Sequence, residues 1–213
     1  MNFCGVSEAF GTGVAQVKLP QSHITFRVDS LLPGLTRDDQ EAAHLESWKR
    51  WARVIGVTVD KHSNPKTDPT QFIVAVNLGG PSGVLADQEL PYGTGLNLRM
   101  RLDNNERWVI ADNPPSGSIN LLAVLCHENG HCLGMQHISA DGDADLMNPT
   151  YSPRIYVPQD DDISYGRKLY GPPTTPAQPT PPGEHPTAIP IEVKIVIGNA
   201  PYSAKGHLKP SAT

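Results

Sequence analysis

Three histidines and one glutamate stand close together in the stretch HENGHCLGMQH, from His127 to His137. Residues four apart lie on one face of a helix, so His127 and His131 can both reach a single metal ion. Gly134 lets the chain turn out of the helix, and His137 can then return as a third nitrogen ligand. Three histidines with an open fourth position are typical of a hydrolytic zinc, so the pattern predicts a catalytic zinc site.

Glu128 directly follows the first predicted ligand and faces the open coordination position. A zinc ion polarises the carbonyl to be cleaved and lowers the pKa of its bound water. A carboxylate at this position can take the proton of that water and pass it to the leaving amine. We therefore predict Glu128 as the general base, with a helix-surface salt bridge as its alternative role.

Two helices and several strands are expected to support this site. The stretch 116–134 predicts the helix that carries the histidines, started by Ser116 or Ser118 and stopped by Gly134. An earlier amphipathic helix is predicted from its N-cap Thr36 to Gly56, with core residues at helical spacing that include Trp48 and Trp51. Strands are predicted in HITFRV, where Ile24, Phe26 and Val28 alternate inward, and in VTVD, QFIVAVNL and LNLRMRL.

Composition and charge exclude several classes of protein. The chain has 213 residues, of which 38% are hydrophobic and 18% charged, an ordinary balance for one globular domain. Its net charge of -5 and the lack of a Lys/Arg block argue against a nucleic-acid partner or a polybasic membrane anchor. No apolar run reaches membrane-spanning length, and the first residues lack the features of a secretory signal. The three cysteines cannot form a complete disulfide framework.

The chain becomes rich in proline after Tyr170: ten of the 21 prolines lie in the last 43 residues. The prolines therefore predict a Pro-rich linker with a C-terminal extension at 172–213. The histidine motif assigns the catalytic domain to 21–171, and we expect residues 1–20 to be a leader or a pro-segment remnant. Within that extension, IPIEVKIVIGN alternates like a half-buried strand.

The pattern HExxHxxGxxH, followed by Met147 in DLMNP, resembles the metzincin metallopeptidases. A further likeness, over residues 22–171, is to the matrixins, the matrix metalloproteinase family, through ITFRVDSLLPGLTRDD, LDNNERW and LMNPTYSPRIYVPQDDDISYGRKLYG. The resemblance implies an α/β (α+β) fold with a twisted, mostly parallel sheet and one antiparallel edge strand. A long first helix, an active-site helix and a C-terminal helix complete it. Met147 would form the apolar floor under the zinc ligands.

Departures from the matrixin pattern concern the other metals. A structural zinc is expected to be absent, because the His-Gly-Asp loop is missing and Asp87 and Arg101 stand where two later histidines would fall. Calcium stays open. Asp103 and Glu106 match the family's carboxylate ligands, but Gly79 replaces an expected aspartate, and both acids can equally be solvated turn residues.

The resemblance also implies how a substrate binds. SGVLADQELPYG, with Leu85 and Ala86, resembles the edge strand that captures an extended peptide by strand addition. Pro149 and Tyr151 match the outer wall of the main pocket, and Ala123 lies where the depth of the pocket is set. A small residue there predicts a deep pocket and a large apolar residue just after the scissile bond, although Ala123 can also be simply a core residue.

Cys4 lies in NFCGVSEAF, which partly resembles the inhibitory cysteine switch of matrixin pro-segments. A thiolate can occupy the fourth zinc position, but an incidental cysteine is the alternative. Because the flanking Phe3, Ser7 and Glu8 depart from the pattern, we expect Cys4→Ser to change little. We expect residues 1–20 to lie along the domain surface.

The predicted function is that of a secreted, monomeric, zinc-dependent endopeptidase that acts on protein or peptide substrates, with extracellular localisation implied by the resemblance. Two alternatives remain: a non-catalytic binding module on a metzincin scaffold, and a zinc hydrolase of a non-peptide substrate. A binding module would be expected to lack Glu128 or one of the histidines, and none is missing.

Overall fold

The computed structural model describes residues 3–4, 18–80, 83–138, 145–174, 190–197 and 200–207. Contacts between Cα atoms divide the chain into two units, Met1–Pro176 and Ala177–Thr213. In the second unit β9 (Pro190–Ile197) and β10 (Ala200–His207) pair as an antiparallel hairpin, and β9 lies within the segment 189–199 that was predicted as a strand. Among the described residues, no helix has the length and apolar character needed to cross a membrane.

The first unit is built on a six-stranded sheet with the order β1-β5-β6-β4-β2-β3. Its strands are β1 (Phe3–Cys4), β2 (His23–Val28), β3 (Thr58–Lys61), β4 (Gln71–Val76), β5 (Val84–Gln88) and β6 (Leu98–Asp103). The pairs from β3 to β6 are parallel, whereas β5 runs antiparallel to β6. The predicted mixed sheet is confirmed, and the two-residue strand β1 adds to it by pairing with β5.

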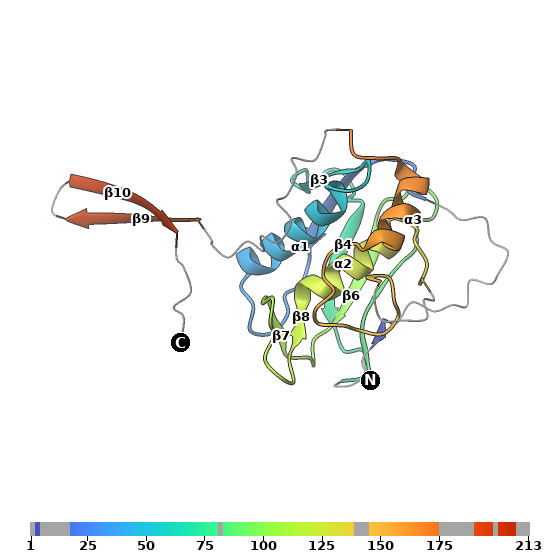
Figure 1. Ribbon diagram of the computed structural model, residues 1–213, viewed down its shortest axis with the longest axis horizontal. Helices are drawn as coiled ribbons and strands as arrows, with labels where there is room; N and C mark the ends of the chain where they lie inside the picture. Colours follow the sequence, from blue (N-terminus) through green and yellow to red (C-terminus); the bar gives the residue numbers. More distant parts are fainter. Residues whose placement is uncertain are drawn as a thin grey trace. The chain divides into compact units, whose positions relative to one another are not determined.

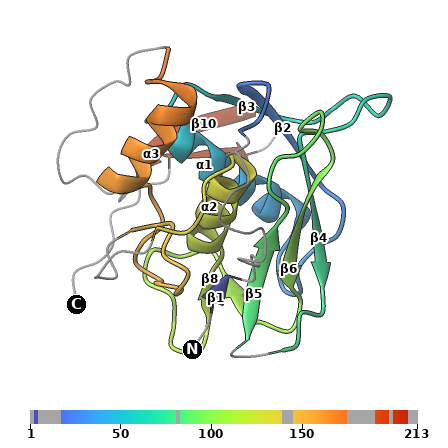
Figure 2. The ribbon, with the colours of Figure 1, turned by 90° about the vertical axis from the view of Figure 1, so that its right-hand side faces the viewer.

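Helices α1 (Arg37–Ala52) and α2 (Leu121–Cys132) pack against one another on one face of this sheet (Figures 1 and 2). Thr36 is the N-cap of α1, as predicted, and its hydroxyl accepts a hydrogen bond from the Asp39 amide at 3.1 Å. Helix α1 ends at Ala52 rather than at Gly56. Gly56 instead allows a close approach, because a Cβ there would lie 2.4 Å from the Tyr170 carbonyl oxygen at the end of α3 (Asp160–Tyr170).

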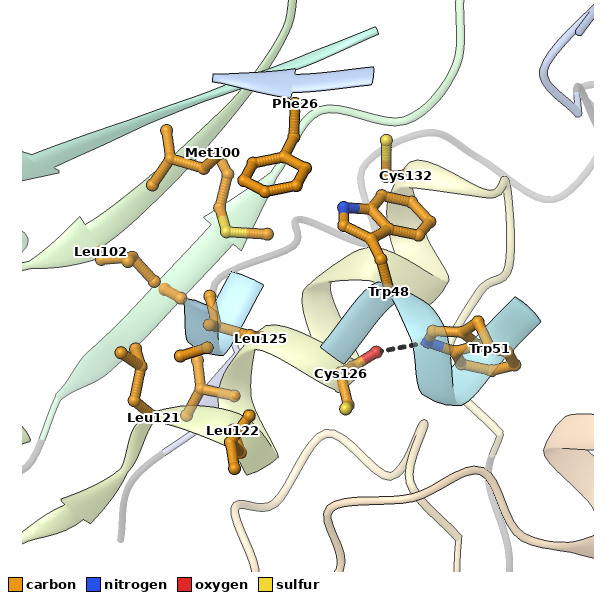
Figure 3. Close-up of a cluster of buried hydrophobic side chains, with 14 of the residues drawn as sticks. Phe26, Trp48, Trp51, Met100, Leu102, Leu121, Leu122, Leu125, Cys126 and Cys132 are labelled. Atoms are coloured by element: carbon orange, nitrogen blue, oxygen red, sulfur yellow. Dashed lines mark hydrogen bonds between the residues drawn. The ribbon is translucent and has the colours of Figure 1, made fainter. Parts of the chain in front are cut away.

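The core lies between the sheet and the two helices. Trp48 and Trp51 are fully buried, as predicted, and pack among side chains from α1, α2, β2 and β6 (Figure 3). The Trp51 indole donates a hydrogen bond to the Cys126 carbonyl at 2.8 Å, which joins α1 to α2 in the middle of the core (Figure 3). Burial raises the pKa of the Cys126 thiol to about 12, so it packs as a small neutral group.

The predicted start of α2 at Ser116 or Ser118 is wrong. Before the helix, β8 (Ile119–Asn120) pairs with β7 (Trp108–Val109), which keeps the backbone extended as far as Asn120. The Ser118 hydroxyl donates to the Pro115 carbonyl at 2.6 Å and is therefore used in the preceding turn. Asn120 is the N-cap instead, since its side-chain oxygen accepts a hydrogen bond from the Leu122 amide at 3.1 Å.

Candidate metal centre

The three predicted zinc ligands converge through one type of atom. The Nε2 atom of His131 lies 3.1 Å from Nε2 of His127 and 3.2 Å from Nε2 of His137. Nitrogens bound tetrahedrally to one zinc at ordinary bond lengths lie about 3.3 Å apart. The arrangement therefore has the spacing of a three-nitrogen metal site.

Backbone carbonyls fix the orientation of the two helical histidines. Nδ1 of His127 lies 2.6 Å from the Leu146 carbonyl oxygen, and Nδ1 of His131 lies 2.8 Å from that of Met135. An oxygen without a proton can only accept, so each Nδ1 carries the hydrogen and each Nε2 presents a lone pair. Burial lowers the pKa of His127 to about 4 and also lowers that of His131, which keeps both rings neutral. The Nε2 lone pairs of these two histidines face one another and repel, and a cation bound between them would remove that repulsion.

The chain leaves α2 as the sequence predicted. Gly134 has a φ of 94°, in the left-handed region that favours glycine, and the turn there brings His137 back toward the helix. Gly130 has a different role. A Cβ at Gly130 would lie 2.3 Å from Sδ of Met147, so the missing side chain lets the methionine pack directly under α2. Met147 is fully buried beneath this part of the helix.

Asp162, at the start of α3, was not singled out from the sequence, although it holds the turn that contains Met147. Its carboxylate accepts hydrogen bonds from the amides of Leu146 at 2.8 Å and Met147 at 3.0 Å. Because the Leu146 carbonyl orients His127, this buried carboxylate also supports the metal centre. Its signal in the sequence was only a run of three aspartates, of which two are exposed.

Glu128 is 1% exposed, and its Oε2 atom has no hydrogen-bond partner. Burial raises the pKa of this carboxyl to about 8, a hydrogen bond with Cys4 opposes the shift, and the charge of Asp87 adds to it. A buried carboxylate with one unpaired oxygen, beside three converging imidazoles, is positioned to exchange a proton with a group bound in the same cavity.

Cys4 joins the three histidines, with its Sγ 3.4 Å from Nε2 of His131 and all four ligand atoms within 4.8 Å of one another. The expectation that the N-terminal segment lies along the surface is wrong for this residue. Phe3 and Cys4 pair in parallel with β5 (Figure 2), and the Cys4 amide donates to the Pro149 carbonyl at 3.1 Å. Backbone groups on both sides thus hold the thiol at the site. Residues 5–17 of the predicted leader lie outside the described part.

One cavity beside Glu128 gathers most of the predicted pocket residues, namely Leu85, Ala123, Pro149 and Tyr151. His127, Glu128 and Cys4 line the same cavity. Ala86 does not line it; Ala86 is buried in β5, between Cys4 on one side and Leu102 on the other. The cavity and the histidine cluster are therefore continuous.

The two predicted calcium residues lie at and after the end of β6. Asp103 is fully buried and accepts hydrogen bonds from the amides of Gly80 at 3.1 Å and Asn105 at 2.9 Å, so its carboxylate joins two loops. Glu106 lies three residues later, and the role of both as calcium ligands stays a prediction. At the positions associated with a structural zinc, Asp87 and Arg101 face each other across β5 and β6 and form a two-bond ion pair.

The fold and the histidine centre define a domain of the zinc-metallopeptidase type. The sequence profile of the family described as Matrixin matches residues 18–171, and the chain belongs to this family. Matrixin enzymes are metalloendopeptidases that use a catalytic zinc and calcium.

Relatives with the same type of domain include stromelysin-1 of Mus musculus, 35% identical over 184 residues, which are 80% of this chain and 37% of that protein. Interstitial collagenase of Oryctolagus cuniculus is 29% identical over 187 residues, or 84% of this chain and 39% of the collagenase. Matrix metalloproteinase-18 of Xenopus laevis is 30% identical over 190 residues, which are 84% of this chain and 39% of that protein. The chain thus spans less than half the length of these relatives.

Proposed function

We propose that the protein is a zinc-dependent endopeptidase that cleaves extended polypeptides. The observation that carries this proposal is the convergence of three histidine Nε2 atoms next to the Oε2 atom of Glu128, which has no hydrogen-bond partner, beside a cavity that Glu128 also lines. His127, His131 and His137 would hold the zinc. When bound, the ion supplies Lewis-acid polarisation of the scissile carbonyl and of the attacking water.

The remaining chemistry belongs to Glu128. Its carboxylate takes a proton from the attacking water and passes it to the amine that leaves. Its burial and the unpaired Oε2 atom support the role, because a base needs an oxygen that is not already engaged to take the proton.

A polypeptide is the substrate that the surrounding backbone fits best. Strand β5 already pairs with one extended segment, β1, and the Pro149 carbonyl accepts a hydrogen bond from that same segment. A substrate strand can bind between these groups in the same way, with one side chain in the cavity next to Ala123. This backbone arrangement favours a peptidase over a hydrolase of non-peptide substrates. The presence of Glu128 with all three histidines argues against a mere binding module.

The proposal includes a latent state. The Cys4 thiol lies where a fourth ligand would bind, and its segment occupies the groove that a substrate would use. In this state the chain excludes both water and substrate from the centre. We further propose that the protein acts outside the cell, as a monomer, and that Asp103 and Glu106 bind calcium.

The test uses the zinc-loaded full chain carrying Cys4→Ser and a library of unstructured peptides. We expect cleavage at internal bonds with a large apolar residue after the scissile bond, and loss of cleavage when zinc is chelated. A variant that retains stoichiometric zinc but cleaves no peptide would contradict the proposed function.

A further inference from the structure

The outer wall of the cavity is an irregular segment that needs anchors from elsewhere. Residues 148–152 and Ile155 line the cavity, yet this stretch contains no helix and only an isolated bridge. Its shape cannot be fixed by a regular hydrogen-bond ladder. The contacts that hold the wall therefore decide how wide the cavity is.

Asn120 anchors this wall at two points. Its backbone amide donates to the Tyr151 hydroxyl at 2.7 Å, and its side-chain Nδ2 donates to the Pro153 carbonyl at 3.2 Å. The same side chain accepts the Leu122 amide through Oδ1 and so begins α2. Asn120 is fully buried, so water does not compete for these hydrogen bonds.

We propose that Asn120 is a positioning residue that sets the width of the cavity and thereby the preference for the residue after the cleaved bond. This inference rests on the proposed endopeptidase function. The inner side of the cavity is α2 itself, with Ala123 and His127 one and two turns beyond the cap. Asn120 holds the opposite wall against the first turn of that helix. The distance between the two walls therefore depends on the hydrogen bonds of Asn120.

The two roles of Asn120, holding the wall and capping α2, can be tested separately. Asn120→Asp keeps an oxygen that can cap the Leu122 amide but replaces the Nδ2 donor with an acceptor that faces the Pro153 carbonyl. Tyr151→Phe removes the other anchor without touching the cap. Ser118→Ala is the matched control, because its hydroxyl donates to the Pro115 carbonyl in the turn before α2 and not to a residue of the wall.

The experiment measures kcat/KM in the zinc-loaded full chain with Cys4→Ser, on peptides that differ only in an alanine, leucine or phenylalanine after the scissile bond. Loss of one buried hydrogen bond should change the ratio of large to small residues by about 3- to 10-fold in Asn120→Asp. Tyr151→Phe should change the same ratio, and Ser118→Ala should leave it unchanged.

Amide hydrogen exchange gives a readout that needs no catalysis. Exchange across 150–157 should accelerate in Asn120→Asp, while the amides of α2 beyond its first turn keep their protection. Equal losses on all three peptides with unchanged exchange would show that Asn120 is only a helix cap and would overturn the inference. A chain that carries Cys4→Ser alone, binds zinc and cleaves no peptide would overturn the proposed function, and this inference with it.

Discussion

Glu128 combines near-complete burial with one carboxylate oxygen that has no partner, which makes it the residue with the clearest expected effect. Glu128→Ala removes the base but leaves the three imidazoles in place. In the chain that also carries Cys4→Ser, we expect a loss of about a hundred- to ten-thousand-fold in kcat relative to Cys4→Ser alone, with zinc content and melting temperature close to those of that reference. Stopped assays on a cleaved peptide, paired with metal analysis, measure both. Activity equal to that of Cys4→Ser alone would show that another group is the base.

The sequence alone predicts that Cys4→Ser changes little, but the structure places the Cys4 sulfur with the three histidines, so we expect Cys4 to act as an inhibitor. Cys4→Ser should raise peptidase activity several-fold, since a serine hydroxyl is not ionised at neutral pH and is a poorer zinc ligand than a thiolate. Thiol reagents should activate the parent and leave the variant unchanged. Cys126 and Cys132 are fully buried and should not react. Equal activity of parent and variant would contradict the role of Cys4.

We expect the buried His44 to make the folded protein less stable in acid. It is fully buried on α1 against the ring of Phe26, neither ring nitrogen has a partner, and burial lowers its pKa to about 3. The unfolded chain takes up a proton near pH 6.5, whereas the folded chain does not until about pH 3. The free energy of unfolding therefore falls as the pH drops through this window, and His44 contributes a loss of about 2 kcal/mol between pH 7 and pH 5.

Urea unfolding of the parent and of His44→Phe at pH 7 and pH 5 tests this expectation. The variant should lose less stability than the parent over that interval, because the histidines of the metal centre contribute equally to both. Identical pH dependence in the two proteins would show that His44 does not cause the loss.

At the scale of the elements, the start of α3 supports the loop that holds the metal centre. Asp162→Ala would leave the Leu146 and Met147 amides without their acceptor, and charge-assisted hydrogen bonds contribute about 1.5 to 3 kcal/mol each. We expect a lower melting temperature and weaker zinc binding, because Leu146 also orients His127. Asp161→Ala, an exposed neighbour on the same helical turn, is the control and should change neither. Parental zinc affinity in Asp162→Ala would contradict this support.

Elements specified by local sequence signals were predicted correctly, whereas features that depend on distant parts of the chain were not. Alternation in HITFRV predicted β2 with its residues, and the acids after Thr36 predicted the cap of α1, because both signals are local. The sequence predicts a serine as the cap of α2, and this prediction fails because a hydroxyl used in a preceding turn cannot be distinguished in sequence from one that caps a helix. The Leu146 and Met135 carbonyls that orient the histidines carry no side-chain signal, and the pairing of β1 with β5 depends on residues about 80 positions apart.

For the whole molecule, we predict one tightly bound zinc per chain. His127, His131 and His137 offer one three-nitrogen centre, whereas Asp87 and Arg101 neutralise each other across β5 and β6. Elemental analysis of the dialysed full chain should give a zinc-to-protein ratio near one, and His131→Ala should lower it toward zero. A ratio of two in the parent would require a second high-affinity site and would contradict the prediction.

The pairing of β1 with β5 has a consequence for solubility as well as for inhibition. An exposed sheet edge presents unpaired backbone groups that can join any other extended chain, and such edges promote aggregation. While Phe3 and Cys4 pair with Val84 and Ala86, this part of the β5 edge is closed to other copies of the protein. Removal of the N-terminal segment opens the groove to substrates and to fellow enzyme molecules alike. Activation should therefore make self-digestion and self-association depend on protein concentration, and the active form should store less well than the latent one.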